Sequence, residues 1–146
     1  MPMLFGRRSI LALLCSGSFF AGVGNACAAD ELKFTELYTT GVELTPKAKS
    51  LAGKDVTMTG FMAPPLKAEA DFFVLTRVPM AVCPFCDSQM DWPDDIVLVM
   101  LDDTVTFMPF NRRITVTGRL EVGFVKDAET GFVSFVRLIG ASYGKV

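Results

Sequence analysis

The chain has 146 residues, a formal net charge of −2 at pH 7 and no histidine. Without an imidazole it cannot carry a Ser-His-Asp triad, a Cys-His dyad or one of the usual histidine-based zinc sites. Its mildly acidic balance argues against nucleic acid as a partner, because that affinity depends mainly on Lys and Arg side chains that neutralise phosphates.

Residues 1–29 have the layout of a cleavable bacterial signal peptide. A short basic region ends in Arg7-Arg8, an apolar run covers 10–23, and small residues follow at 26–28. The apolar run is shorter than the roughly 20 residues that a membrane-spanning helix needs. We therefore expect cleavage near Ala28 or Ala29 and a periplasmic protein.

The route of export stays open. Segment 7–11 (RRSIL) resembles the twin-arginine motif, in which paired arginines are followed one residue later by two bulky apolar residues. Gly6 stands where that motif prefers Ser, and an ordinary secretory signal would explain the same arginines. Lipidation of Cys27 is a further alternative, although Gly24 occupies the position where such sites usually have Leu.

Removal of the leader leaves 117 of the 146 residues with a formal charge of −4, since Arg7 and Arg8 leave with it. That length suffices for one compact domain, which we predict over 45–146 after an extended lead-in over 30–44. Thr45 and Pro46, with Gly53 beyond them, are typical of one short helix. Thr can cap the first amides, Pro suits the first helical position and Gly suits the exit.

After this helix the apolar residues recur with period two, which indicates half-buried antiparallel strands. The predicted inner faces are Val56, Met58 and Met62 in the first strand, and Ile114, Val116, Leu120 and Val122 in the fourth. Three further strands are predicted over 72–75, 96–101 and 132–139. These three are richer in apolar residues, so we expect them to be more central.

Segments 56–60 (VTMTG) and 114–118 (ITVTG) are near-copies on the first and fourth strands. A glycine inside a strand usually marks a sharp bend or a close backbone approach. Five strands, two of them bent, and one short N-terminal helix predict a mostly β fold, a small five-stranded OB-like Greek-key barrel. An immunoglobulin-like sandwich is the alternative, although it requires about seven strands.

Cys83 and Cys86 form a Cys-x-x-Cys pair in the long segment 78–95, between the second and third predicted strands. A connection of this length without obvious structure is often functional. The other two cysteines, Cys15 and Cys27, belong to the leader. The mature chain is therefore left with one pair of thiols, and three interpretations of it stay open.

In the first interpretation the pair binds a metal. Two thiolates supply half of a tetrahedral zinc site, and Asp87, Asp91, water or a second subunit would complete it. Met80 and Met90 flank the pair, and thioethers beside thiolates suit Cu(I), although methionine also commonly fills apolar gaps. The candidate ligands for zinc or copper are Cys83, Cys86, Asp87, Met80 and Met90; no catalytic residue and no organic cofactor is predicted.

The second interpretation is a thiol-disulfide oxidoreductase, and the third is a structural disulfide in a non-catalytic interaction module. A thioredoxin-like site places its Cys-x-x-Cys motif at the N-terminus of a helix, and Pro93 with the neighbouring acidic residues leaves little room for one before Ile96. A disulfide that closes so small a ring should stabilise the fold by only about 2 kcal/mol.

Segments 51–64, 72–75, 96–99 and 114–118, together with the cysteine before the third strand, resemble an exported bacterial family known as domain of unknown function 3299. The resemblance spans about residues 48–143. Members of that family typically have a cysteine, a nearby histidine and a run of prolines ending in Asn before the third strand. This chain keeps Cys83 and Pro93 but lacks the histidine and the proline run.

The resemblance implies a periplasmic accessory of metal handling, because such proteins are often found beside an ABC-type ATPase and permease associated with zinc acquisition. Cys83 is the ligand position that carries over, and Cys86 as a substitute for the histidine is our own inference. We therefore expect a non-enzymatic protein that binds or relays zinc or copper. Its expected partners are an ABC-type permease or another periplasmic metal carrier, or a second copy joined through the cysteine loop.

Overall fold

The computed structural model describes residues 28–65, 69–81, 94–128 and 131–146. The predicted leader, apart from its last two residues, and the Cys-x-x-Cys pair lie outside these ranges. Within them the protein is mostly β, with one α-helix, α1 (Pro46–Leu51), and one short 3-10 helix, η1 (Phe34–Glu36). None of the helices in the described part of the chain is long and apolar enough to cross a membrane.

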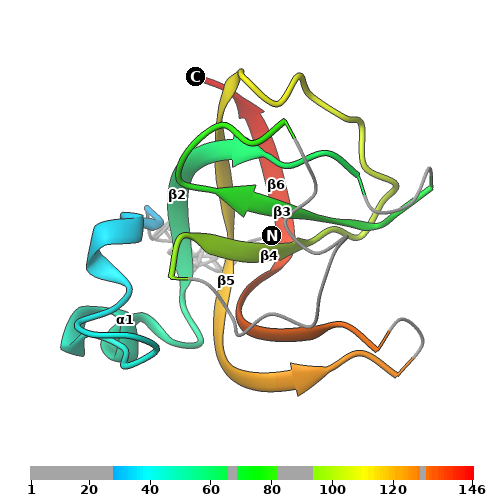
Figure 1. Ribbon diagram of the computed structural model, residues 1–146. Coiled ribbons are helices and arrows are strands. Elements are labelled where there is room, and N and C mark those ends of the chain that lie inside the picture. The colour runs from blue at the N-terminus through cyan, green and yellow to red at the C-terminus, as the bar shows by residue number, and fades with distance from the viewer. Residues whose placement is uncertain (1–27, 66–68, 82–93, 129–130) are drawn as a thin grey trace, which may run out of the picture.

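Six strands form one mixed sheet (Figure 1). They are β1 (Asp30–Glu31), β2 (Asp55–Met62), β3 (Phe72–Thr76), β4 (Ile96–Met100), β5 (Arg113–Lys126) and β6 (Val133–Lys145). The prediction of five strands is wrong by one, because the lead-in expected to be merely extended contributes β1. Only two residues of β1 pair with β2, and so short a strand leaves no periodicity to detect.

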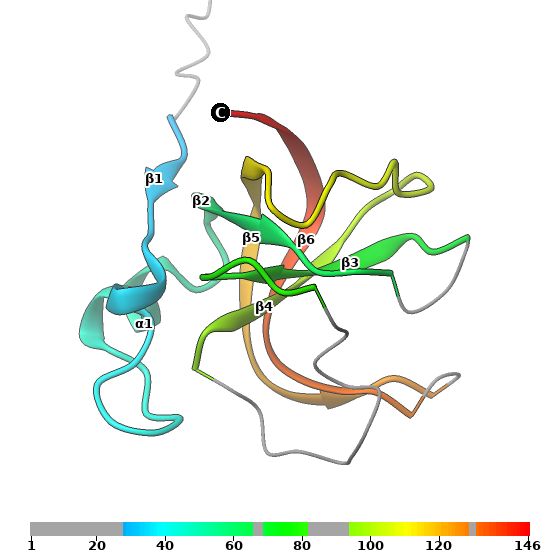
Figure 2. The same ribbon diagram turned by 45° about the horizontal axis from the view of Figure 1, so that its top comes forward.

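The strand order is β1-β2-β3-β4-β6-β5, and β2 also pairs with β5. The pairings among β2, β3, β4, β6 and β5 therefore form a closed ring. β1 lies outside this ring and pairs with β2. Two of the pairings, β1 with β2 and β4 with β6, are parallel, and the others are antiparallel. The N-terminal segment and α1 lie to one side of this sheet (Figure 2).

The helix α1 begins and ends as its sequence predicts. The Thr45 hydroxyl accepts a hydrogen bond from the amide of Ala48 at 3.1 Å, and Pro46 occupies the first helical position. Gly53 lies just beyond the helix with φ +81°. Ala48 and Leu51 bury the inner side of the helix in the main core.

The predicted inner faces of the first and fourth strands are confirmed. Val56, Met58 and Ile114 are completely buried, whereas the intervening threonines are half-buried or exposed. Thr57 and Thr117 face each other on the outer side, with their hydroxyl oxygens 2.9 Å apart. The period-two pattern therefore separates one packed face from one face open to solvent.

The strands β3 and β4 are buried on both faces, which is why their sequences are almost continuously apolar. One face joins the main core through residues such as Leu75 and Val97. The other face forms a second cluster, defined by the buried residues Ala63, Val74, Ile96 and Leu98. The expectation of a more central place is confirmed for these two strands, whereas the third strand of that group, β6, is buried only in part.

The two strand glycines mark close approaches, as predicted. A Cβ added to Gly60 would lie 2.5 Å from the carbonyl oxygen of Thr76, so only glycine lets β2 pass β3 at this point. Gly118 lies at a register shift, where Thr117 pairs with Ser142 but Arg119 pairs with Ile139. An extra residue of β6 is accommodated there by Gly140 at φ +57°, a conformation that suits glycine.

This bulge explains why β6 is longer than predicted. The expected strand ended at residue 139, just before Gly140. The chain instead continues in the sheet to Lys145, and β5 and β6 run side by side along their length (Figure 1). A second register shift lies between Val122 and Val125.

Candidate functional site

The two ends of the cysteine-bearing segment are held together at the end of the β3–β4 pair. Thr76, the last residue of β3, pairs with Ile96, the first residue of β4. One step further along, the amide of Arg77 donates a hydrogen bond to the carbonyl oxygen of Asp95 at 2.9 Å. The segment therefore leaves the sheet and returns to it at adjacent positions.

The exit from β3 is tied down by a buried side chain. The Thr76 hydroxyl is completely buried, donates to the carbonyl oxygen of Val78 at 2.7 Å and lies 3.2 Å from that of Phe61. This contact fixes the backbone on the N-terminal side of the segment against β2. The residues that follow, Arg77 and Val78, are exposed.

Of the predicted metal ligands, Met80 alone lies within the described residues, where it is half-buried. Cys83, Cys86, Asp87 and Met90 lie outside them, so their roles stay predictions. In the described part of the chain, no three His, Cys, Asp or Glu side chains are gathered in a way that would hold a metal ion.

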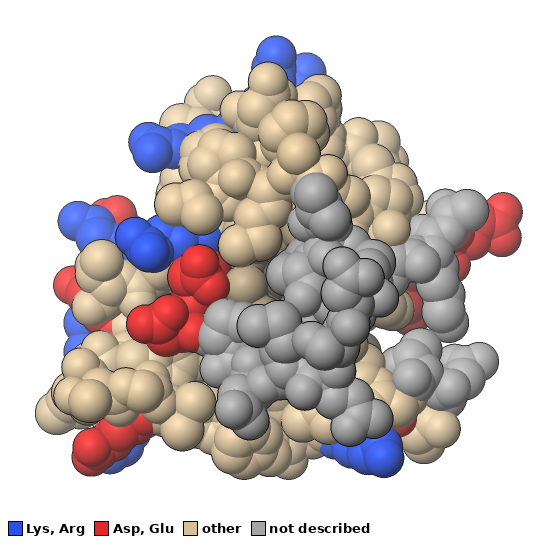
Figure 3. Space-filling model, in the orientation of Figure 1, with Lys and Arg blue, Asp and Glu red and all other residues tan. Residues whose placement is uncertain are grey.

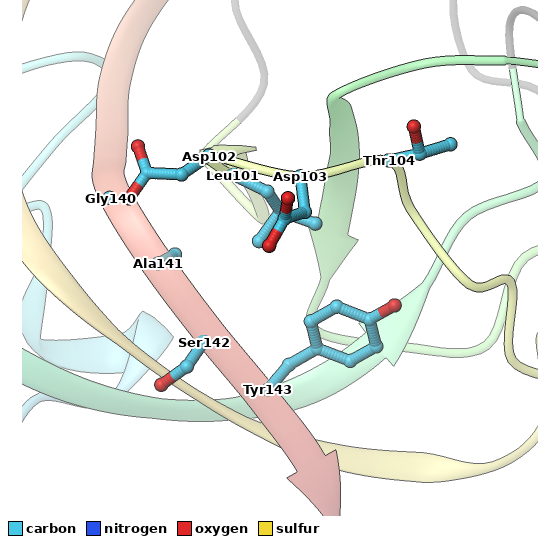
Figure 4. A pocket seen from close by; sticks show the side chains of 8 residues that line it. All are labelled: Leu101, Asp102, Asp103, Thr104, Gly140, Ala141, Ser142 and Tyr143. Atoms are coloured by element: carbon cyan, nitrogen blue, oxygen red, sulfur yellow. The ribbon is translucent and has the colours of Figure 1, made fainter.

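An open cavity of about 410 Å³ lies between the segment 101–104 and β6 (Figure 4). Its lining residues are Leu101, Asp102, Asp103, Thr104, Gly140, Ala141, Ser142 and Tyr143. Asp103 points toward the space between the two segments, and Asp102 lies close to Gly140 (Figure 4). The sequence offers no local signal for this cavity, because the bulge of β6 that faces the two aspartates depends on long-range pairing.

The polar groups of this cavity do not form a catalytic arrangement. The hydroxyl of Tyr143 accepts a hydrogen bond from the amide of Thr106 at 2.8 Å and donates to the carbonyl oxygen of the same residue at 2.7 Å. Both bonds hold the segment after the cavity to β6.

Glu36, far from the cavity in sequence, has a lowered pKa. The hydrogen bond from the Lys47 ammonium, 2.7 Å from Glu36 Oε2, lowers the pKa of this carboxyl, and the backbone amide of Lys33 lowers it further. These contacts join η1 to α1. Glu36 is therefore a surface connection and not a catalytic group.

Arg137 is a buried cation that the sequence analysis missed. Its side chain donates to the carbonyl oxygens of Gly123 and Ser134 at 2.9 and 3.2 Å, and to the Ser134 hydroxyl at 3.1 Å. Glu121 lies 3.7 Å away as its ion-pair partner. The available signal was an arginine inside the apolar run of β6. Its hydrogen bonds join β5 to β6 across the second register shift, and we call this arrangement the Arg137 clamp.

No family model matches the sequence, and no curated protein matches it. Among solved structures, the fold is similar to a crystal structure of a DUF3299 family protein from Pseudomonas aeruginosa PAO1. The TM-score is 0.50 at 15% sequence identity, and the match covers 82% of this chain and 97% of the other. At that identity the likeness concerns the fold alone. The resemblance to the domain of unknown function 3299 expected from the sequence is thus confirmed at the level of the fold.

Proposed function

We propose that this protein is a periplasmic accessory that binds or relays a transition metal, zinc or copper, through Cys83 and Cys86. The observation that carries the proposal is the pairing of two thiols in a chain without histidine, on a segment whose ends are joined at Arg77 and Asp95. Thiolates are preferred ligands of both metals. Asp87, Met80 and Met90 are the further donors.

We also propose that the closed set of strand pairings is an OB-like Greek-key barrel. Its support is the ring of pairings from β2 to β6, with the parallel β4–β6 pair and with glycines where strands approach closely. In such a barrel, β3 and β4 hold the two ends of the cysteine-bearing segment. Connections between the strands of a scaffold commonly carry binding residues.

The signal-like residues 1–29 support export to the periplasm, and the family resemblance supports an ABC-type permease or another metal carrier as partner. A second copy is a further candidate partner, since two protomers that each give two thiolates would complete a four-sulfur site. In this proposal the protein is not an enzyme. The barrel itself does not favour one of these roles, because the same fold serves many functions.

Metal content tests the proposal directly. Protein purified anaerobically under reducing conditions should contain close to one zinc or copper ion per site, measured by elemental mass spectrometry. C83S/C86S should reduce the content to background while the thermal transition shows that the fold is kept. The matched control, D102N/D103N, removes two carboxylates from the cavity and should leave the metal content unchanged.

The same preparations separate the proposal from its rivals. Background metal in reduced wild-type protein contradicts metal binding. If that protein instead reduces a disulfide substrate with a thiol pKa well below the ordinary value of about 8.5, the oxidoreductase is favoured. If the double-serine variant folds and keeps its partner, the pair is a structural disulfide in an interaction module.

A further inference from the structure

The end of the molecule where β5 begins and β6 ends has an excess of positive charge. Arg112, Arg113 and Lys145 are all exposed there. The segments 104–120 and 133–146 contain neither Asp nor Glu. None of the ion pairs between described residues involves these three cations. We name Arg112, Arg113 and Lys145, with Phe110 and Val146, the basic tip.

Pairing between the strands brings these residues together. Lys145 is the register partner of Ile114, the residue next to Arg113. The amide of Val146 lies 3.5 Å from the carbonyl oxygen of Arg113, and the guanidinium of Arg113 lies 5.9 Å from the centre of the Phe61 ring. The start of β5 and the end of β6 therefore form a single surface.

Apolar side chains project from the same tip. The amide of Arg112 donates to the carbonyl oxygen of Pro109 at 2.8 Å, which closes a tight turn with Phe110 at its outer side. The side chain of Phe110 is 42% exposed and that of Val146 is 76% exposed. This turn and the C-terminus lie at the same extremity of the molecule (Figure 1), and its upper end in Figure 3 has basic but no acidic side chains.

We propose that the basic tip docks on an anionic lipid surface. Clustered Lys and Arg attract anionic headgroups, and exposed apolar residues beside them insert at the membrane interface. A projecting turn suits a flat bilayer, whereas a protein partner would have to offer a cavity that fits it. The tip carries only three basic side chains, so binding is weak and sensitive to salt. This surface goes beyond the proposed metal site and does not depend on the cysteines.

Flotation with lipid vesicles tests the proposal. Residues 28–146 contain every described element of the fold and lack the apolar run of the leader, which would itself bind lipid. At low ionic strength this chain should float with vesicles of phosphatidylethanolamine and phosphatidylglycerol and not with zwitterionic vesicles. R112Q/R113Q should lower partitioning about thirtyfold, since each lost charge is worth about fivefold. F110S should also lower it, without changing the dependence on salt.

Two control variants change the same kinds of side chain, basic and aromatic, at other places on the surface. K49Q/K54Q makes the same change of charge near α1, and F124S removes a side chain that is 64% exposed on the β5–β6 hairpin. The partitioning of both variants onto anionic vesicles should stay within twofold of that of the wild type. The same is expected for C83S/C86S. The proposal is overturned if the wild-type protein does not float with anionic vesicles, or if K49Q/K54Q lowers partitioning as much as R112Q/R113Q does. It is also overturned if binding requires a membrane protein in the vesicles.

Discussion

Among the described glycines, Gly60 leaves the least space for a Cβ. The carbonyl oxygen of Thr76 would lie 2.5 Å from a Cβ, and side-chain atoms of Leu75 and Phe34 would lie 3.1 Å away. A backbone oxygen cannot move aside as a flexible side chain can. The constraint comes from β2 crossing β3, and it explains why the VTMTG motif ends in glycine.

We predict that Gly60→Ala lowers the free energy of unfolding by about 1–3 kcal/mol, the usual cost of overpacking a well-packed site. Urea denaturation followed by circular dichroism measures it. Gly144→Ala is the matched control, because no atom lies within 4 Å of a Cβ at Gly144. A change within about 0.5 kcal/mol is expected for the control. Equal stability of the two variants would show that the crossing is looser than described.

The stability of the fold depends on pH in the acidic range through Glu36. Its folded pKa is lowered, chiefly by Lys47, from an ordinary value of 4.5. The contribution of the ionised Glu36 to stability is therefore present at pH values above its unfolded pKa. It is lost as the pH falls through its folded pKa. Glu36→Gln should lower the melting temperature at pH 7 and should have no effect at a pH below both values. Melting curves across this range check it; a difference that grows as the pH falls would contradict the assignment.

At the scale of elements, the junction between the lead-in and α1 depends on Thr45. Its hydroxyl accepts from the Ala48 amide and donates to the carbonyl oxygen of Glu36, so one side chain joins η1 to α1. Thr45→Ala should cost about 1 kcal/mol, within the range for a lost helix cap. Thr40→Ala, on an exposed residue of the same segment, should be neutral in the same chemical denaturation experiment. Two indistinguishable midpoints would exclude the capping role.

The β5–β6 hairpin depends on the Arg137 clamp. Arg137 is 6% exposed and donates to acceptors on both strands of the hairpin. Arg137→Met keeps the volume but leaves these acceptors without a donor, so we expect a loss of about 1–3 kcal/mol. Arg119→Met, on an exposed ion pair with Glu121 at 3.6 Å, should cost less than about 1 kcal/mol. Hydrogen exchange of the Ser134 amide should rise in the first variant and not in the second.

The elements that the sequence predicted well are those with local signals. Period two identified the inner faces of β2 and β5, and the Thr-Pro pair with a following Gly identified α1. Features that depend on distant partners were missed. They include β1, which pairs through two residues, and the bulge at Gly140, beyond which β6 continues to Lys145.

At the scale of the whole molecule, the strand pairings hold the two ends of the cysteine-bearing segment next to each other. β3 and β4 are buried on both faces, and their ends are joined by Thr76, Ile96, Arg77 and Asp95. Of the candidate site, the sequence predicts the donors, and the structure describes the two ends of the segment that carries them. The choice among metal, disulfide and redox chemistry depends on the oxidation state of two sulfurs, which spacing alone does not determine.

A native mass spectrum of the exported chain, recorded with and without reductant, tests the central claim most directly. The metal-carrier account predicts a chain cleaved near Ala28 whose reduced form carries a zinc or copper ion, as a monomer or as a dimer. That ion should be absent from C83S/C86S. A reduced wild-type chain that takes up no metal when zinc or Cu(I) is supplied would contradict the account.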